Sequence, residues 1–160
     1  MALKWKKSDL MTLAEKKVQM ANETCQSLIY AGIDVQLAGG TEHFALEPND
    51  QTNIDSMFTA VTLGATQYPY HSDGAQCKMY SAVDIVTLYV AYKTFVTKQT
   101  TYCNFLKIWV NRETDKDVLA GITYGSELPS DLNAEMEEIL TAAAAEIQAI
   151  IGKMQQTMEA

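Results

Sequence analysis

A helix that ends at a glycine and passes directly into a hairpin constrains this fold more than any other feature of the sequence. Gly32 follows a helical pattern, at a position where glycine commonly ends a helix. Residues 33–37 then alternate apolar and polar side chains, as a half-buried strand does. Gly39-Gly40 turns the chain, and residues 41–46 return as a second strand. The segment predicts a structural unit, and nothing in it performs chemistry.

A second hairpin is predicted after a short helix. Asn49 or Asp50 begins this helix, which occupies about residues 51–63 and carries apolar residues on one face. Asp73-Gly74 lies between two alternating segments, which is a strong signal for a tight hairpin turn. Pro69 places its strand at an edge or at the first residue of a strand, because proline has no backbone N–H to donate. We expect the two hairpins to form one small antiparallel sheet.

Longer helices are predicted before and after these hairpins. Apolar residues recur at three- and four-residue steps over residues 8–30, 82–111 and 130–154. Ser81 and Asp84 have the spacing of a capping box at the start of the central helix. The threonine-rich run at 97–101 has a poor helix propensity, so we expect a weak point or a kink there. Thr114 and Asp117 predict the cap of a single helical turn.

These elements predict an α+β protein with one small antiparallel sheet. The sheet consists of two β-hairpins covered by helices, with a long central helix and a long C-terminal helix. Residues 1–160 suit a single domain. Within it we expect an N-terminal helix over 1–30, a hairpin–helix–hairpin–long-helix core over 31–128 and a C-terminal helix over 129–160.

The charge distribution argues against nucleic acid as the main partner. The net charge is −8, with +3 on the first 17 residues and −11 on the remainder. Binding to phosphates needs a basic face, which the acidic body lacks. The basic N-terminal run is typical of a solvated helix start.

No segment has the pattern of a signal peptide or of a membrane span. Polar residues, and not an apolar run, follow the lysines near the N-terminus. The longest uncharged run, residues 56–72, is interrupted by Gly64, Pro69 and His71. We expect a protein that is made in the cytosol and stays in solution.

A metal site is the sharpest chemical hypothesis that the residues allow. His71 and Cys77 lie on either side of the second turn, and zinc needs about four nitrogen or sulfur ligands. His43 and Cys25 would have to converge on the same point through the fold, because no pair has the spacing of a known motif. The alternative is that His71 or Asp73 bonds the backbone of the turn.

The three cysteines give little support to thiol chemistry. Their odd number and wide spacing predict no disulfide framework. Cys77 or Cys103 as a nucleophile would need a positioned base and an activated thiolate, and neither has a matching local pattern. Cys103 lies on the apolar stripe of the central helix, as a small hydrophobic residue does. We therefore expect no enzyme and no cofactor, with a cysteine- or metal-dependent hydrolase as the last alternative.

The C-terminal helix carries an apolar stripe that exceeds what a small sheet can cover. The stripe residues that we expect at an association surface are Met136, Ile139, Leu140, Ala143, Ile147 and Ile151. The four alanines at 142–145 would let another helix approach closely. We expect a homo-oligomer, and the alternative is that the helix over 8–30 packs along this stripe within one chain.

An ordered series of short motifs resembles a domain of unknown function found in phages and prophages, common in tail-associated proteins of Gram-positive gut bacteria and their viruses. The resemblance covers about residues 15–132. Its motif residues include Gly32, His43, Phe44, Asp50, Gln51, Asn53, His71, Asp73, Gly74, Tyr124, Gly125 and Pro129.

The resemblance implies a structural role rather than a catalytic one. Such domains are similar to components of the virion tail, baseplate or fibre region, which act through contacts with other phage structural proteins. An assembly chaperone for a tail fibre is the alternative. The implied location is the tail region of the virion, after synthesis in the host cytoplasm. The family brings no catalytic residues to carry over.

Overall fold

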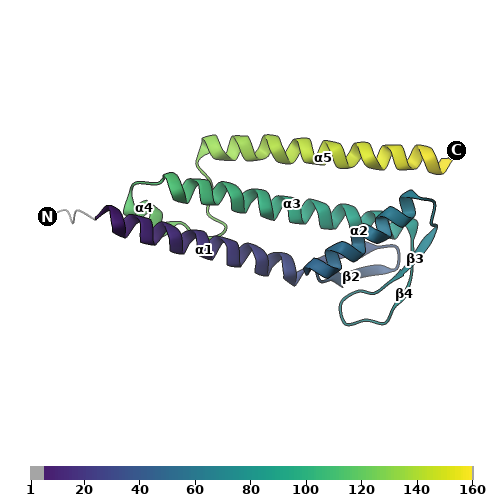
Figure 1. Ribbon diagram of the computed structural model, residues 1–160. Helices are drawn as coiled ribbons and strands as arrows, with labels where there is room; N and C mark the ends of the chain where they lie inside the picture. The colour runs from purple at the N-terminus through teal and green to yellow at the C-terminus, as the bar shows by residue number, and fades with distance from the viewer. Residues whose placement is uncertain (1–5, 160) are drawn as a thin grey trace. The chain divides into compact units, whose positions relative to one another are not determined.

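The computed structural model describes residues 6–159 (Figure 1), and these residues divide into two compact units. Unit 1 holds the described residues up to Ser27 together with Lys98–Leu140. Unit 2 holds Leu28–Thr97 and the described residues from Thr141 onward. The predicted N-terminal helix over 1–30 therefore has its first five residues outside the described part of the chain.

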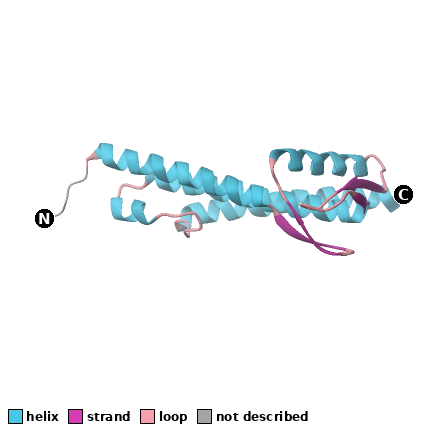
Figure 2. Cartoon of the chain, turned by 90° about the horizontal axis from the view of Figure 1, so that it is seen from below, coloured by secondary structure: helices cyan, strands magenta, loops and turns pink. Residues whose placement is uncertain are grey.

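The predicted α+β class is confirmed, with a long central helix and a long C-terminal helix (Figures 1 and 2). The elements are α1 (Lys7–Ala31), β1 (Ile33–Leu37), β2 (Gly40–Phe44), α2 (Pro48–Thr62), β3 (Gln67–Tyr70), β4 (Lys78–Ser81), α3 (Ala82–Arg112), α4 (Lys116–Gly121) and α5 (Ser130–Glu159). The described strands all belong to the two hairpins. Helix α3 is continuous through the threonine-rich run, and the boundary between the units falls there, at Thr97.

The two hairpins form two separate antiparallel sheets, and the predicted single sheet is wrong. Strand β1 pairs with β2, and β3 pairs with β4. The loop after β3, and not β3 itself, reaches the first hairpin, where the Asp73 N–H donates to the carbonyl of His43 at 2.8 Å. Strand β3 contains Pro69, which cannot donate to a ladder. The hairpins instead meet through aromatic side chains.

The second turn is longer than the predicted tight hairpin. Residues 71–77 connect β3 to β4, and a turn at the tip is closed by a bond from Ala75 N–H to the carbonyl of Ser72 at 3.1 Å. Gly74 has a φ of +70°, whereas no non-glycine residue among those described has a positive φ. The predicted turn at Asp73-Gly74 is therefore present, with only the glycine in the left-handed region.

Two helices begin at other residues than the sequence predicted. Helix α2 begins at Pro48, because proline at the first helical position loses no bond and the Asp50 carboxylate accepts from the Glu47 N–H at 3.0 Å. Asp115, and not Thr114, caps α4, accepting from two backbone N–H groups at 2.9 and 3.2 Å. Ser81 caps α3 as predicted, with its hydroxyl 3.1 Å from the Asp84 N–H.

Each unit has its own apolar core. The buried residues of unit 1 include Ala21, Cys25, Cys103, Phe105, Leu106, Val110, Leu119, Ile122, Leu128, Leu132 and Met136. Those of unit 2 include Val35, Leu37, Phe44, Leu46, Ile54, Met57, Phe58, Val61, Tyr70, Tyr80, Ile85, Leu88 and Tyr92. The core of unit 2 thus joins both hairpins to α2 and to the first half of α3.

Among the described glycines, Gly32 is the one that another backbone segment approaches closely. Its N–H caps α1 by donating to the carbonyl of Ile29 at 3.0 Å, and its φ is +85°. A Cβ at this position would lie 2.0 Å from the carbonyl oxygen of Phe44 and 2.7 Å from its carbonyl carbon. Only glycine satisfies both the backbone angle and the space.

Substitution of three glycines tests this approach. We expect Gly32→Ala to lower the free energy of unfolding by about 3 kcal/mol or more, because strain and a backbone clash add. Gly74→Val, which meets open space, should cost about 1–3 kcal/mol from the positive φ alone. Gly39→Ala is the control in the same hairpin as Gly32, since its Cβ meets nothing within 4 Å. Denaturant unfolding measures all three, and equal stability of Gly32→Ala and Gly39→Ala would contradict the account.

Candidate functional site

His43 ties the first hairpin to the end of helix α1. Its Nδ1 lies 2.7 Å from an Asp34 carboxylate oxygen, and its Nε2 lies 2.7 Å from the carbonyl of Ala31. Both partners are acceptors, so both ring nitrogens donate only in the charged imidazolium. The Asp34 bond first, and the Ala31 carbonyl second, raise the pKa of His43 above its usual 6.5.

The motif residues at the start of α2 satisfy backbone groups. Asp50 accepts from the Glu47 N–H, and the Gln51 side chain donates to the carbonyl of Leu46 at 2.9 Å. Burial, with a contribution from Asp50, raises the pKa of Tyr70 to about 12. Asn53, in contrast, is exposed. Apart from Asn53, these residues have a structural explanation.

Phe44 joins the two hairpins through its ring. It stacks on Tyr70 with ring centroids 6.2 Å apart and meets Tyr80 edge-on at 6.1 Å. The Tyr80 hydroxyl donates to Glu42 at 2.9 Å, and the Lys78 ammonium pairs with the same carboxylate at 3.0 Å. Glu42 and Phe44 lie two residues apart on one face of β2, so β2 contacts β4 through this face.

The motif residues of the second loop also bond backbone groups. His71 Nδ1 lies 3.0 Å from the carbonyl of Ser72, and Asp73 bonds His43 through its N–H. This arrangement is the turn-bonding alternative that the sequence left open for His71.

In unit 1 the motif residues Tyr124, Gly125 and Pro129 fix the connector before α5. The Tyr124 hydroxyl donates to the Gln99 side chain at 2.8 Å. The Gly125 N–H donates to the Tyr102 hydroxyl at 2.8 Å, and that hydroxyl donates to the carbonyl of Ser126 at 2.7 Å. The carbonyl of Pro129 accepts from the Asn133 N–H at 2.9 Å in the first turn of α5.

The predicted chemical candidates do not come together. Residues 6–159 contain no group of three or more histidine, cysteine, aspartate or glutamate side chains arranged to hold a metal ion. Cys25 is buried, whereas Cys77 is exposed. Burial, and then the neighbouring Cys25 thiol, raise the pKa of Cys103 to about 11, the opposite of what a thiolate nucleophile needs.

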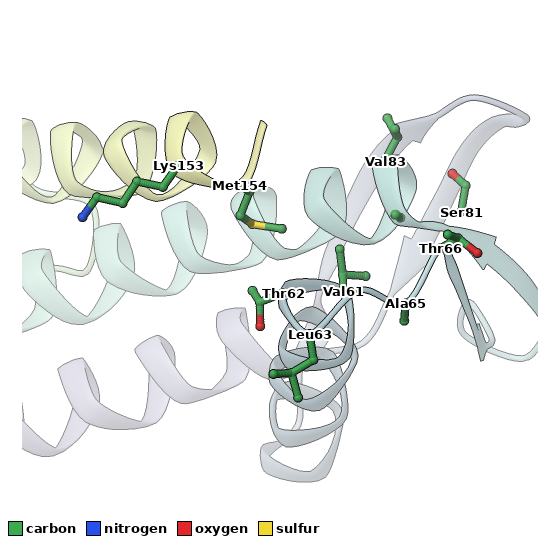
Figure 3. A pocket seen from close by; sticks show the side chains of 11 residues that line it. Val61, Thr62, Leu63, Ala65, Thr66, Ser81, Val83, Lys153 and Met154 are labelled. Atoms are coloured by element: carbon green, nitrogen blue, oxygen red, sulfur yellow. The ribbon is translucent and has the colours of Figure 1, made fainter. Parts of the chain in front are cut away.

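An apolar groove in unit 2 is the strongest candidate for a functional surface. Its volume is about 540 Å³. Helices α3 and α5 line it with Ala82, Val83, Val86, Thr87, Val90, Ala91, Ile151, Met154 and Gln155. A second hollow of about 720 Å³ adjoins it, sharing Val83 and Met154 and reaching the end of α2 at Leu63 (Figure 3). Leu63 is 84% exposed and Val83 is 68% exposed.

The C-terminal part of α5 contacts this unit only partly. None of residues 141–156 is fully buried, and Ala143, Ile147 and Ile151 are half-buried. Ile139 and Ile150 are exposed, whereas Leu140 is half-buried. Met136 lies in the core of unit 1.

Sequence reasoning missed the wall of the groove that α3 supplies and the edge of the adjoining hollow at the end of α2. Val83, Val86 and Val90 have the same helical periodicity as core residues, so the pattern assigned them no separate role. The position of Leu63, directly before the glycine that ends α2, was the one indication in the sequence that an aliphatic residue here could be exposed.

No helix within residues 6–159 combines the length and apolar character needed to cross a membrane.

A family model described as Domain of unknown function (DUF4376) matches residues 12–123. The chain belongs to this family. The predicted membership of a domain family of unknown function is thereby confirmed, whereas the association with phage tails stays a prediction. No curated protein and no solved structure matches the chain. The DUF4376 match includes all of α2 and α3, and helix α5 follows it. The family segment therefore supplies one wall of the groove, and α5 supplies the other.

The charged pair at His43 predicts a pH-dependent stability. Because folding raises the pKa of His43, its contribution is complete below about pH 6.5 and is lost as the pH rises through the folded-state value. The side chain is 43% exposed, so we expect only about 0.5–1 kcal/mol. Wild type and His43→Gln should differ most in unfolding free energy at pH 5.5–6.5 and least above pH 8.5.

Asp34→Asn is the matched control, because it keeps the Ala31 bond and removes the charge partner. It should flatten most of the pH dependence. A difference between wild type and His43→Gln that stays constant from pH 5.5 to 9 would contradict the charged pair.

Proposed function

We propose that this protein is a structural component of a bacteriophage particle, in the tail, baseplate or fibre region, and acts through protein–protein contacts. The ordered motifs between about residues 15 and 132 support the class of particle through their resemblance to tail-associated proteins. The apolar groove of α3 and α5, with the adjoining hollow that reaches the end of α2, supports the mode of action, and it is the observation that carries the proposal.

The groove is a surface that favours being covered. Leu63 and Val83, which are 84% and 68% exposed, both line the adjoining hollow and lie at different places around it in Figure 3. Burying apolar area contributes about 25 cal/mol per Å². Contiguous apolar patches on a soluble protein commonly mark interaction sites.

A second copy of the chain is the occupant that we propose. The half-buried stripe of Ala143, Ile147 and Ile151 runs along one helix, and a two-fold axis would bury the same stripe on both copies. The alanines at 142–145 have short side chains, which permits close helix packing. The protein is thus proposed to be a homo-oligomer that also binds other phage structural proteins.

A tail-fibre assembly chaperone is the alternative. A chaperone would use the same apolar surface and then leave, so it would be absent from finished particles. Mass spectrometry of purified particles of the encoding phage separates the two. We expect this chain in stoichiometric amounts, and its absence from particles that contain the fibre would favour the chaperone.

Light scattering after size exclusion tests the association. We expect wild type to be at least a dimer at micromolar concentration, and Ile151→Asp to weaken association by roughly ten-fold or more. Ile108→Asp is the matched control, because Ile108 is an aliphatic residue of α3 that is 41% exposed and lies outside the groove. A monomeric wild type whose mass does not change in Ile151→Asp would contradict the proposal.

A further inference from the structure

Two buried thiols face each other across helices α1 and α3 in unit 1. The Cys103 sulfur lies 3.5 Å from the carbonyl of Ala21, one turn before Cys25. The Cys25 sulfur lies 3.6 Å from the carbonyl of Gln99, one turn before Cys103. This reciprocal contact brings both sulfurs into the same gap between the helices. Burial first, and then the neighbouring Cys25 thiol, raise the pKa of the Cys103 thiol to about 11.

The helices approach closely at this point. Ala21 is fully buried, and Cys25 and Cys103 are 7% and 5% exposed. A thiol that reaches the backbone of the facing helix has its Cβ near that helix, as a disulfide requires. Neither cysteine forms a disulfide in this structure.

The position of the pair gives a crosslink there a specific effect. The chain leaves unit 1 after Ser27 and re-enters it at Lys98. Cys25 lies shortly before the first of these points and Cys103 shortly after the second, so both residues belong to unit 1. A bond between them would close a loop that contains all of Leu28–Thr97, and long closed loops restrict the unfolded chain most.

We propose that Cys25 and Cys103 form a thiol–disulfide couple that locks α1 to α3 when the protein meets a small disulfide oxidant of the glutathione class. The Cys25 thiol loses its proton and attacks one sulfur of the oxidant, which releases one thiol and leaves a mixed disulfide. Cys103 then loses its proton, attacks the Cys25 sulfur and releases the second thiol. Because the pKa of Cys103 is raised, this step is slow near neutral pH and faster in an alkaline medium. Two protein thiols are oxidised, and one oxidant disulfide is reduced to two thiols.

Whether this disulfide forms in unit 1 depends on the redox state of the compartment that holds the protein. In a reducing cytosol the thiols stay free, and unit 1 relies on its packing. In an oxidising medium the crosslink holds α1 against α3 even when residues 28–97 open. The inference rests on the geometry of unit 1 and does not depend on the proposed function.

Oxidation of the folded full chain tests the couple. The background is Cys77→Ser, which removes the exposed thiol. After treatment with oxidised glutathione, we expect loss of both titratable thiols, a mass lower by two hydrogens and a linked peptide containing Cys25 and Cys103. The unfolding temperature should rise by about 5–10 °C relative to the protein in dithiothreitol.

Cys25→Ser in the same background is the matched control, and its unfolding temperature should not rise with the oxidant. Peptide mapping of the unsubstituted chain gives the same answer if this variant does not fold. The proposal is overturned if both thiols stay titratable in the folded protein, if the bond forms only in denaturant, or if oxidation lowers the unfolding temperature.

Discussion

The approach of the Phe44 carbonyl to Gly32 is the constraint on which the rest of unit 2 depends. The carbonyl oxygen occupies the space that any other residue would fill with a Cβ. This approach sets the first hairpin against the end of α1, where His43 reaches the carbonyl of Ala31. It also sets the ring of Phe44 between Tyr70 and Tyr80, which attaches the second hairpin. A backbone contact thus determines how three successive elements pack.

The motif residues and the groove have different roles. Most motif residues cap helices, close turns or bridge the hairpins, and their polar groups bond the chain itself. They leave little chemistry for a substrate. The aliphatic residues around Val83 and Leu63 contribute little to the core, because most of their surface is exposed. The exposed residues that we propose for association are therefore largely distinct from those that hold the fold.

The sequence predicted the helices and hairpins because their signals are local. Periodicity located α1, α3 and α5, and glycines located both turns. The start of α2 was misplaced because Pro48 and the Glu47–Asp50 cap extend the helix toward its N-terminus. The single sheet was wrong because strand pairing depends on tertiary geometry, which Pro69 and the loop at 71–77 alter. The contact between Cys25 and Cys103 could not be predicted, since spacing alone does not determine cysteine pairing.

Amide hydrogen exchange at two protein concentrations tests the central claim most directly. The claim is that the core of unit 2, formed by α2, the hairpins and the first half of α3, is complete within one chain, whereas residues 141–156 of α5 form a surface that we propose a partner covers. We predict that the α2 amides exchange slowly at both concentrations, whereas the amides of 141–156 exchange fast in dilute protein and slowly in concentrated protein. Amides of 141–156 that exchange as slowly as those of α2 in a dilute monomer would contradict the claim.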